Sequence, residues 1–227
     1  MKKTDSIYLT GIMSLIIQIL TGIFDLYVVF LPVKPGFFLI KQLLILELIV
    51  QIFEGTFYIW LVRNFQHIEN ITQYRYWDWL ITTPTMLITF SFYLMFLKNT
   101  QEKQVNQDTF VSLAQKNWDI LIWIIILNAI MLLFGYLGEI GKLSHVLATT
   151  LGFIPFFIYF FLVYVYFAKW TQLGQTLFFV FFGIWAAYGI ASLMKYHLKN
   201  AMYNILDLFS KNLFGIFLAF ILFINRG

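Results

Sequence analysis

The stretch RYWDWLITTPT, residues 75 to 85, places an arginine, an aspartate and three threonines on an otherwise apolar segment. The chain around it has 227 residues, of which 61% are hydrophobic and 11% are charged, and its mean hydropathy is +0.80. A soluble domain normally carries about 25% charged residues. The composition therefore predicts a membrane protein, and charged side chains kept inside a membrane span indicate a functional site.

Apolar runs separated by clusters of charge extend over the whole sequence. Each run is long enough to cross a hydrocarbon core of about 30 Å at a rise of about 1.5 Å per residue. Because no linker, repeat or nucleotide-binding loop interrupts the pattern, it predicts one all-α, multi-pass membrane domain over residues 1–227. The seven expected spans are residues 6–30, 36–62, 73–97, 118–140, 144–168, 172–195 and 198–224.

The composition also limits the possible partners and chemistry. The net charge of +4 is spread over many loops without a basic patch, so nucleic acid is not an expected partner. The absence of cysteine excludes disulfides, thiol catalysis and thiolate metal sites, and we expect neither an enzyme nor a metal site. The partners that remain possible are the lipid bilayer, monovalent cations or protons, and a second copy of the chain that packs against the aromatic outer surface.

Polar residues recur at helical spacing in four of the expected spans. Serine and threonine can bond to their own helix and glutamine can join helices, but intramembrane acids normally face a cavity or a partner. We therefore expect a polar pathway among the first, second, third and seventh spans. The four stripes are Thr10, Ser14, Gln18, Thr21 and Asp25; Glu47, Gln51, Glu54 and Tyr58; Asp78, Thr82, Thr85 and Thr89; and Asn200, Asn204, Asp207 and Lys211.

Lys211 lies about halfway along the last span, with Asp207 one turn before it. A lysine at that depth is too far from either end to extend its amine easily into water. It can pair with an acid, or lose its proton and condense with a carbonyl to form a Schiff base. These residues alone favour the ion pair and leave the Schiff base open.

Further motifs resemble those of the microbial, or type 1, rhodopsins. The third span reads RYWDWLITTP over residues 75–84, the last reads DLFSK over 207–211, and WAAY occupies 185–188, while Asn128 fits the family's pattern in the fourth span. The resemblance implies all-trans retinal in a Schiff base on Lys211, an N-terminus outside and a cytoplasmic C-terminus. It implies Asp78 and Asp207 as counterions, Arg75 ordering them, and a pocket that includes Trp79, Thr82, Thr83, Met86, Met131, Gly135, Trp185 and Tyr188.

The transport mode depends on where the sequence departs from the family's proton pumps. Their carboxylate seven residues after the Thr82 position is Thr89 here, and residues 195–199 lack the acids of their release group. Glutamates in the second span instead resemble those of light-gated cation channels, particularly the channel-forming viral rhodopsins of large algal viruses. A cation channel is therefore favoured, and the expected ion pathway contains Ser14, Glu47, Gln51, Glu54 and Asn204.

The alternative is an outward proton pump in which Asp78 accepts the proton. A sensory photoreceptor that signals through a partner, and a transporter without retinal in which Asp207 pairs with Lys211, are weaker alternatives.

Overall fold

The computed structural model describes residues 3–67, 69–102 and 108–227, and within these ranges the chain is almost entirely helical. Seven helical segments are long and apolar enough to span a membrane, as the sequence predicts. They contain α1 (Lys3–Phe30), α2 (Phe38–Asn64), α3 (Ile71–Gln101), α5 (Trp118–Glu139), α6 (His145–Val163), α7 (Gln172–Ser192), and α8 (Tyr196–Asp207) with α9 (Leu213–Ile224).

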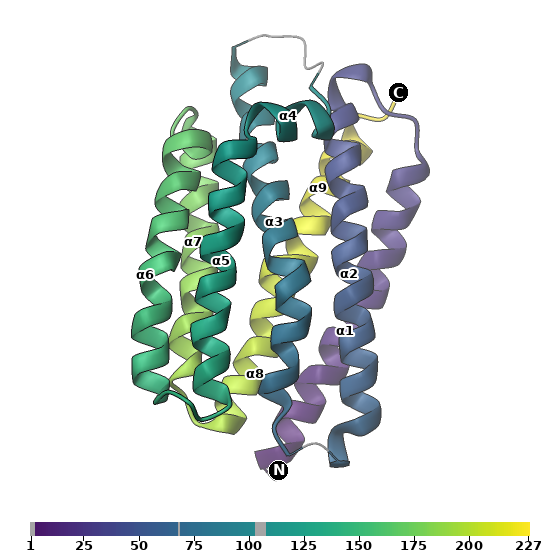
Figure 1. Cartoon of the computed structure of the whole chain (residues 1–227). Helices are drawn as coiled ribbons and strands as arrows, with labels where there is room; N and C mark the ends of the chain where they lie inside the picture. The colour runs from purple at the N-terminus through teal and green to yellow at the C-terminus, as the bar shows by residue number, and fades with distance from the viewer. Residues whose placement is uncertain (1–2, 68, 103–107) are drawn as a thin grey trace.

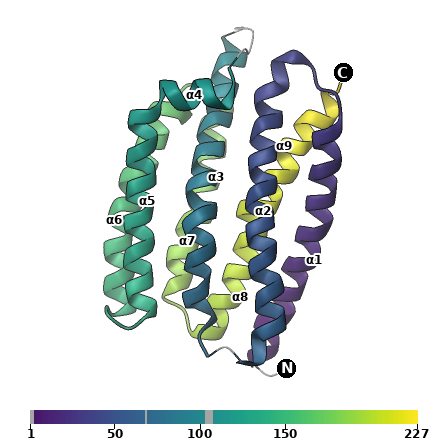
Figure 2. The ribbon, with the colours of Figure 1, turned by 45° about the vertical axis from the view of Figure 1, so that its right-hand side comes forward.

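The helices form an upright bundle in which the first and last spans are neighbours (Figure 1). The α5–α6 pair lies on one side, α1 and α2 lie on the other, and α3 runs between them (Figure 2). A short helix, α4 (Phe110–Lys116), caps the end of the bundle at which the C-terminus lies (Figure 1). The bundle thus brings α1, α2, α3 and α8–α9 together, and these are the helices that carry the polar stripes.

Local sequence signals determine where several helices begin. The side chains of Asn70, Ser144 and Thr171 accept hydrogen bonds from backbone N–H groups in the first turns of α3, α6 and α7. Gly141 has a φ of 75°, which allows the tight connection between α5 and α6. Most helix ends lie within a few residues of the expected ones, but α8 begins at Tyr196, inside the expected connection.

The last span is less regular than its sequence predicts. A π-helical turn, Leu208–Asn212, separates α8 from α9 and contains Lys211. The wider turn holds three consecutive side chains, Ser210, Lys211 and Asn212, at 3% exposure or less. A regular helix would turn one of three successive residues away from the interior, whereas π turns commonly occur at functional sites.

The outer surface of this bundle differs from that of a soluble protein, although apolar side chains also fill its core. Large apolar side chains such as Phe30, Ile52 and Trp77 are exposed on the outside. Carboxylates and amides are buried between the helices, including Asp25 and Glu54 at 0% exposure. Such a surface is stable against lipid, where the helices satisfy their own backbone hydrogen bonds. The protein is therefore a multi-pass membrane protein whose chemistry faces inward.

Candidate functional site

Three carboxylates from three different helices surround the Lys211 amine. Its Nζ lies 2.7 Å from Asp78 Oδ2, 3.5 Å from Glu54 Oε1 and 3.7 Å from Asp207 Oδ1. All four side chains are at most 3% exposed. A buried cation needs compensating charge, and here the shortest contact is with Asp78 rather than with Asp207 on the same helical segment.

Asp207 is held at a distance from the amine by other donors. Its Oδ2 accepts a 2.7 Å hydrogen bond from the Tyr58 hydroxyl, and its Oδ1 accepts one of the same length from the Tyr188 hydroxyl. Arg75 Nη1 lies 3.4 Å from Oδ2. Tyr58 lies on the predicted polar stripe of the second span, but its sequence neighbourhood does not indicate that it bonds to Asp207, 149 residues away.

Arg75 is fixed on the side of this cluster nearer the N-terminal end of α1. Its Nε donates to Asn200 Oδ1 at 3.2 Å, and its Nη2 donates to Asn204 Oδ1. The guanidinium is therefore shared among Asp207 and two amides of α8. This arrangement orients Arg75 toward the carboxylate cluster and joins α3 to α8.

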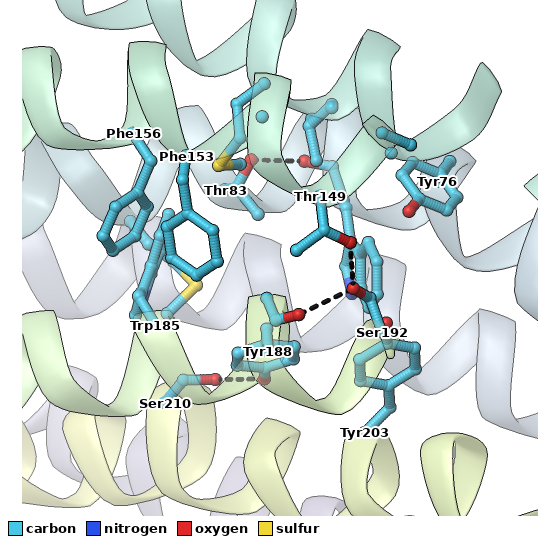
Figure 3. A pocket seen from close by; sticks show the side chains of 18 of the residues that line it. Tyr76, Thr83, Thr149, Phe153, Phe156, Trp185, Tyr188, Ser192, Tyr203 and Ser210 are labelled. Carbon is cyan, nitrogen blue, oxygen red and sulfur yellow. Dashed lines mark hydrogen bonds between the residues drawn. The ribbon is translucent and has the colours of Figure 1, made fainter. Parts of the chain in front are cut away.

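A cavity extends from Lys211 between α3, α5, α6 and α7 (Figure 3). Aromatic rings dominate its wall, with Phe153, Phe156 and Trp185 gathered in one region and Tyr76, Ser192 and Tyr203 in another (Figure 3). Most residues that the sequence places in the retinal pocket line this cavity: Trp79, Thr83, Met86, Met131, Gly135, Trp185, Tyr188 and Lys211.

Two glycines leave room for rings in the cavity wall. A Cβ built on Gly135 would lie 2.5 Å from the Tyr76 hydroxyl, and one on Gly189 would lie 2.5 Å from the Phe153 ring. Hydroxyl pairs fix other parts of the wall, including Tyr188 with Ser210 at 2.8 Å (Figure 3). The wall is thus largely apolar, with a few paired hydroxyls and an amine at one end.

This chemistry fits retinal, which is a long apolar polyene with an aldehyde at one end. Trp79 and Trp185 offer aromatic faces to the polyene, and Lys211 offers the amine that condenses with the aldehyde. The three carboxylates around Lys211 suit a positive charge at that position. The residues present can therefore hold the cofactor that the sequence motifs imply.

Two neighbouring threonines of the third span have different positions. Thr82 is fully buried but does not line the cavity, and its hydroxyl donates to the backbone oxygen of Asp78 at 3.0 Å. Thr83 lies on the wall, where its hydroxyl accepts a 2.8 Å hydrogen bond from Asn128 of α5. Thr82 therefore bonds back to its own helix, α3, one turn after Asp78, whereas Thr83 links α3 to α5 in the cavity wall.

The residues expected along an ion pathway fall into separate groups. Ser14 donates to the backbone oxygen of Asn204 at 2.9 Å, whereas Glu54 contacts Lys211 rather than either of them. Gln51 donates to Asp25 at 2.5 Å. Glu47 lies beside Thr89, toward the other end of the bundle. The structure thus places Ser14 beside Asn204, Glu54 beside Lys211, and Gln51 and Glu47 closer to the other end of the bundle.

A second buried ion pair joins residues that the sequence places near the membrane surface. Lys199 Nζ lies 2.6 and 2.8 Å from the two carboxylate oxygens of Glu139, linking the start of α8 to the end of α5. Both residues are less than 9% exposed. The residues are 60 positions apart, and no periodicity in the sequence relates them.

The Glu139–Lys199 pair yields a stability prediction. Glu139→Gln is expected to lower the free energy of unfolding by about 3–5 kcal/mol, because it leaves the Lys199 charge buried without its partner. The double variant Glu139→Gln/Lys199→Met is expected to recover much of this loss, since it removes both charges. Thermal unfolding of the three proteins measures the effect. A double variant less stable than the single one would show that the pair is not the source of the loss.

Comparison with known proteins places this geometry in a family. The family model described as bacteriorhodopsin-like protein matches residues 5–225. The structure of a viral rhodopsin, OLPVRII, superposes with a TM-score of 0.81 at 27% identity, covering 95% of this chain and 96% of that one. The blue light-absorbing proteorhodopsin from Med12 gives a TM-score of 0.73 at 19% identity, with 96% of each chain covered, which shows a shared fold.

A curated relative agrees with this assignment. The green-light absorbing proteorhodopsin of the gamma-proteobacterium EBAC31A08 is 26% identical over an alignment of 172 positions, which covers 65% of this chain and 60% of that protein. The sequence-based resemblance to microbial rhodopsins, viral ones included, is confirmed. Members of this family use retinal as their chromophore. Because the family model covers nearly the whole sequence, the chain belongs to the bacteriorhodopsin-like family of microbial rhodopsins.

Proposed function

We propose that this protein is a light-gated cation channel with its N-terminus outside. The observation that carries the proposal is the column of buried polar side chains that follows α1, α2, α3, α8 and the π turn from one end of the bundle toward the other. Retinal bound to Lys211 supplies the absorption of light and a change of shape within the cavity. The chain's own residues then determine whether an ion can pass.

In this proposal, ions enter at the end of the bundle where α1 begins. A polar hollow there is lined by residues of α1, the α2–α3 connection and α8, among them Arg63, Glu69 and Tyr196. The Tyr196 backbone oxygen accepts a 3.0 Å hydrogen bond from Asn200, which in turn binds Arg75. Arg75 does not line this hollow but is linked to it through Asn200, so we propose that an ion leaving the hollow toward the column next meets Arg75.

Two contacts close the pathway in this conformation. Arg75 bridges α3 to Asp207 and Asn204 of α8, and Ser14 joins α1 to α8 through the backbone of Asn204. Both contacts end on the helix that leads into the π turn with Lys211. A movement at Lys211 can therefore separate these contacts, and the exposed carboxylates would then favour cations over anions.

Photocurrent at several membrane voltages tests the proposal. We expect the current to reverse sign, and its reversal potential to follow the cation gradient when that gradient is changed. Glu54→Gln is expected to weaken the preference for cations over anions, while Asp119→Asn, which alters an exposed carboxylate outside the column, leaves the preference unchanged.

An outward proton pump is the second candidate, and the 2.7 Å contact between Asp78 and Lys211 favours it, since a proton acceptor must lie close to its donor. A pump produces a current that keeps one direction under every gradient. Illuminated cells in unbuffered medium would then acidify that medium against an applied gradient. A current of one fixed direction, or acidification against the gradient, would overturn the channel proposal.

A further inference from the structure

A second group of buried acids lies on the other side of Lys211, toward the C-terminal end of the bundle. It contains Asp25 of α1 and Glu47 of α2, at 0% and 1% exposure. Gln51 links the two acids, because it donates to Asp25 and lies one helical turn after Glu47 on α2. Among the described residues, neither carboxylate has a basic side chain within 4 Å, because Lys211 contacts Asp78, Glu54 and Asp207 instead.

The charges of the polar column do not balance. Its buried acids are Asp25, Glu47, Glu54, Asp78 and Asp207, and its buried bases are Arg75 and Lys211. Both bases lie in contact with the cluster of Glu54, Asp78 and Asp207. Two carboxylates without a cation in a low-dielectric interior are very unfavourable unless they are protonated or bind a positive ion.

Two amide side chains near Asp25 each have an oxygen without a protein partner among the described residues: Gln51 bonds Asp25 itself, and Asn212 bonds Thr21, one turn before Asp25 on α1. Gln51 donates through Nε2 to Asp25 Oδ2 at 2.5 Å, but its Oε1 has no hydrogen-bond partner among the described residues. Asn212 donates to Thr21 at 3.0 Å, and its Oδ1 is likewise unpaired. Gln51 is 6% exposed and Asn212 is 1% exposed. An oxygen that accepts no hydrogen bond at such burial is suited to coordinate a cation.

Two glycines create the space in which these groups meet. A Cβ on Gly215 of α9 would lie 2.7 Å from both Asp25 Oδ2 and Gln51 Nε2, and one on Gly22 of α1 would lie 3.0 Å from Gln51 Oε1. The Asp25–Gln51 pair therefore depends on the absence of side chains on both neighbouring helices. The backbone packing places the acid and the amide in a defined cradle rather than in a loosely packed interior.

We infer that Asp25, Glu47, Gln51 and Asn212 form a binding site for one dehydrated monovalent cation between α1, α2 and the last span. The oxygen donors suit an alkali metal ion. No group of three or more acidic, histidine or cysteine side chains that could hold a metal ion occurs among the described residues, so a strongly charged divalent site is not indicated. The site would be occupied in the dark and does not depend on whether the protein is a channel or a pump.

Sodium binding to the retinal-loaded protein in lipid nanodiscs tests this site without illumination. With Na⁺ replaced by N-methylglucamine at constant ionic strength as the reference, we expect saturable uptake of one Na⁺ per chain and a higher thermal midpoint in Na⁺. Asp25→Asn and Glu47→Gln are each expected to weaken binding by at least about tenfold, since each removes a charge in direct contact with the ion. Asp119→Asn is the matched exposed control.

A steric variant tests the cradle while keeping every charge. Gly215→Ala is expected to weaken Na⁺ binding, whereas Gly183→Ala, whose Cβ would meet nothing within 4 Å, is expected to have no effect. Infrared spectra of the wild type supply an independent measurement. If both acids carry protons instead of a cation, carboxylic acid bands assigned to Asp25 and Glu47 persist in Na⁺ and no saturable binding is found, and that result overturns the site.

Discussion

A Lys211→Ala variant supplied with all-trans retinal is expected to show no visible absorption band, whereas the wild type becomes coloured. The structure places this amine at the end of the aromatic cavity, with carboxylates from α2, α3 and α8 around it. No other lysine lines the cavity among the described residues. Removing the amine removes the covalent attachment, and free retinal absorbs at shorter wavelength.

The control for this experiment is Lys116→Ala, which alters a lysine whose side chain is 65% exposed. Because Lys211→Ala also leaves three buried carboxylates without their cation, helix content by circular dichroism must show that the variant is folded. Borohydride reduction of the wild-type linkage, followed by peptide mass spectrometry, gives an answer that does not need the variant. A retinyl group on any peptide other than the one with Lys211, or a coloured Lys211→Ala protein, would contradict the assignment.

The second large effect is expected from Asp78→Asn, which should shift the visible band to longer wavelength. A carboxylate 2.7 Å from the Lys211 nitrogen stabilises positive charge there. Excitation moves that charge away along the polyene, so the carboxylate raises the excitation energy. At that distance, and for an effective dielectric constant of about 20, the carboxylate and the positive nitrogen attract each other by about 6 kcal/mol. Loss of this attraction corresponds to a shift of the absorption maximum by roughly tens of nanometres.

Asp207→Asn and Glu54→Gln are the matched comparisons for Asp78→Asn. Their carboxylates lie 3.7 and 3.5 Å from the same nitrogen. The charge of Asp207 is also shared with the hydroxyls of Tyr58 and Tyr188. We therefore expect smaller shifts from both, measured as absorption spectra at one pH. A larger shift in Asp207→Asn than in Asp78→Asn would show that Asp207 is the dominant counterion.

The proposed sodium site and the two contacts that close the channel lie at different heights in the same column. Arg75 and the Lys211 cluster lie nearer the start of α1, while Asp25 and Glu47 lie toward its end. An ion held at Asp25 and Glu47 would place a positive charge in the half of the column from which a pump must reprotonate and through which a channel must conduct. The two proposals can fail separately. Absence of Na⁺ binding with intact photocurrents overturns the sodium site alone, and Na⁺ binding without a reversing photocurrent overturns the channel alone.

The sequence by itself determined the seven spans, because apolar length and charge spacing follow directly from the thickness of the bilayer. It also determined the inward faces of four helices, since residues three or four apart share a face. The motifs around Asp78 and Lys211 predicted most of the pocket wall, because α3, α5, α7 and the last span contribute to it through short local stretches. The part of the wall that α6 contributes, including Phe153 and Phe156, was not predicted from the sequence.

Tertiary structure alone decided which of these polar residues meet. Glu54 contacts Lys211, Asp25 pairs with Gln51, and Glu139 pairs with Lys199. Helical periodicity gives the face on which a side chain lies, but not the height and rotation at which one helix packs against another. Those two quantities depend on side-chain packing, on glycines such as Gly215 and on the π turn at Lys211. They fix the distances between charges, and in a low-dielectric interior the distances determine function.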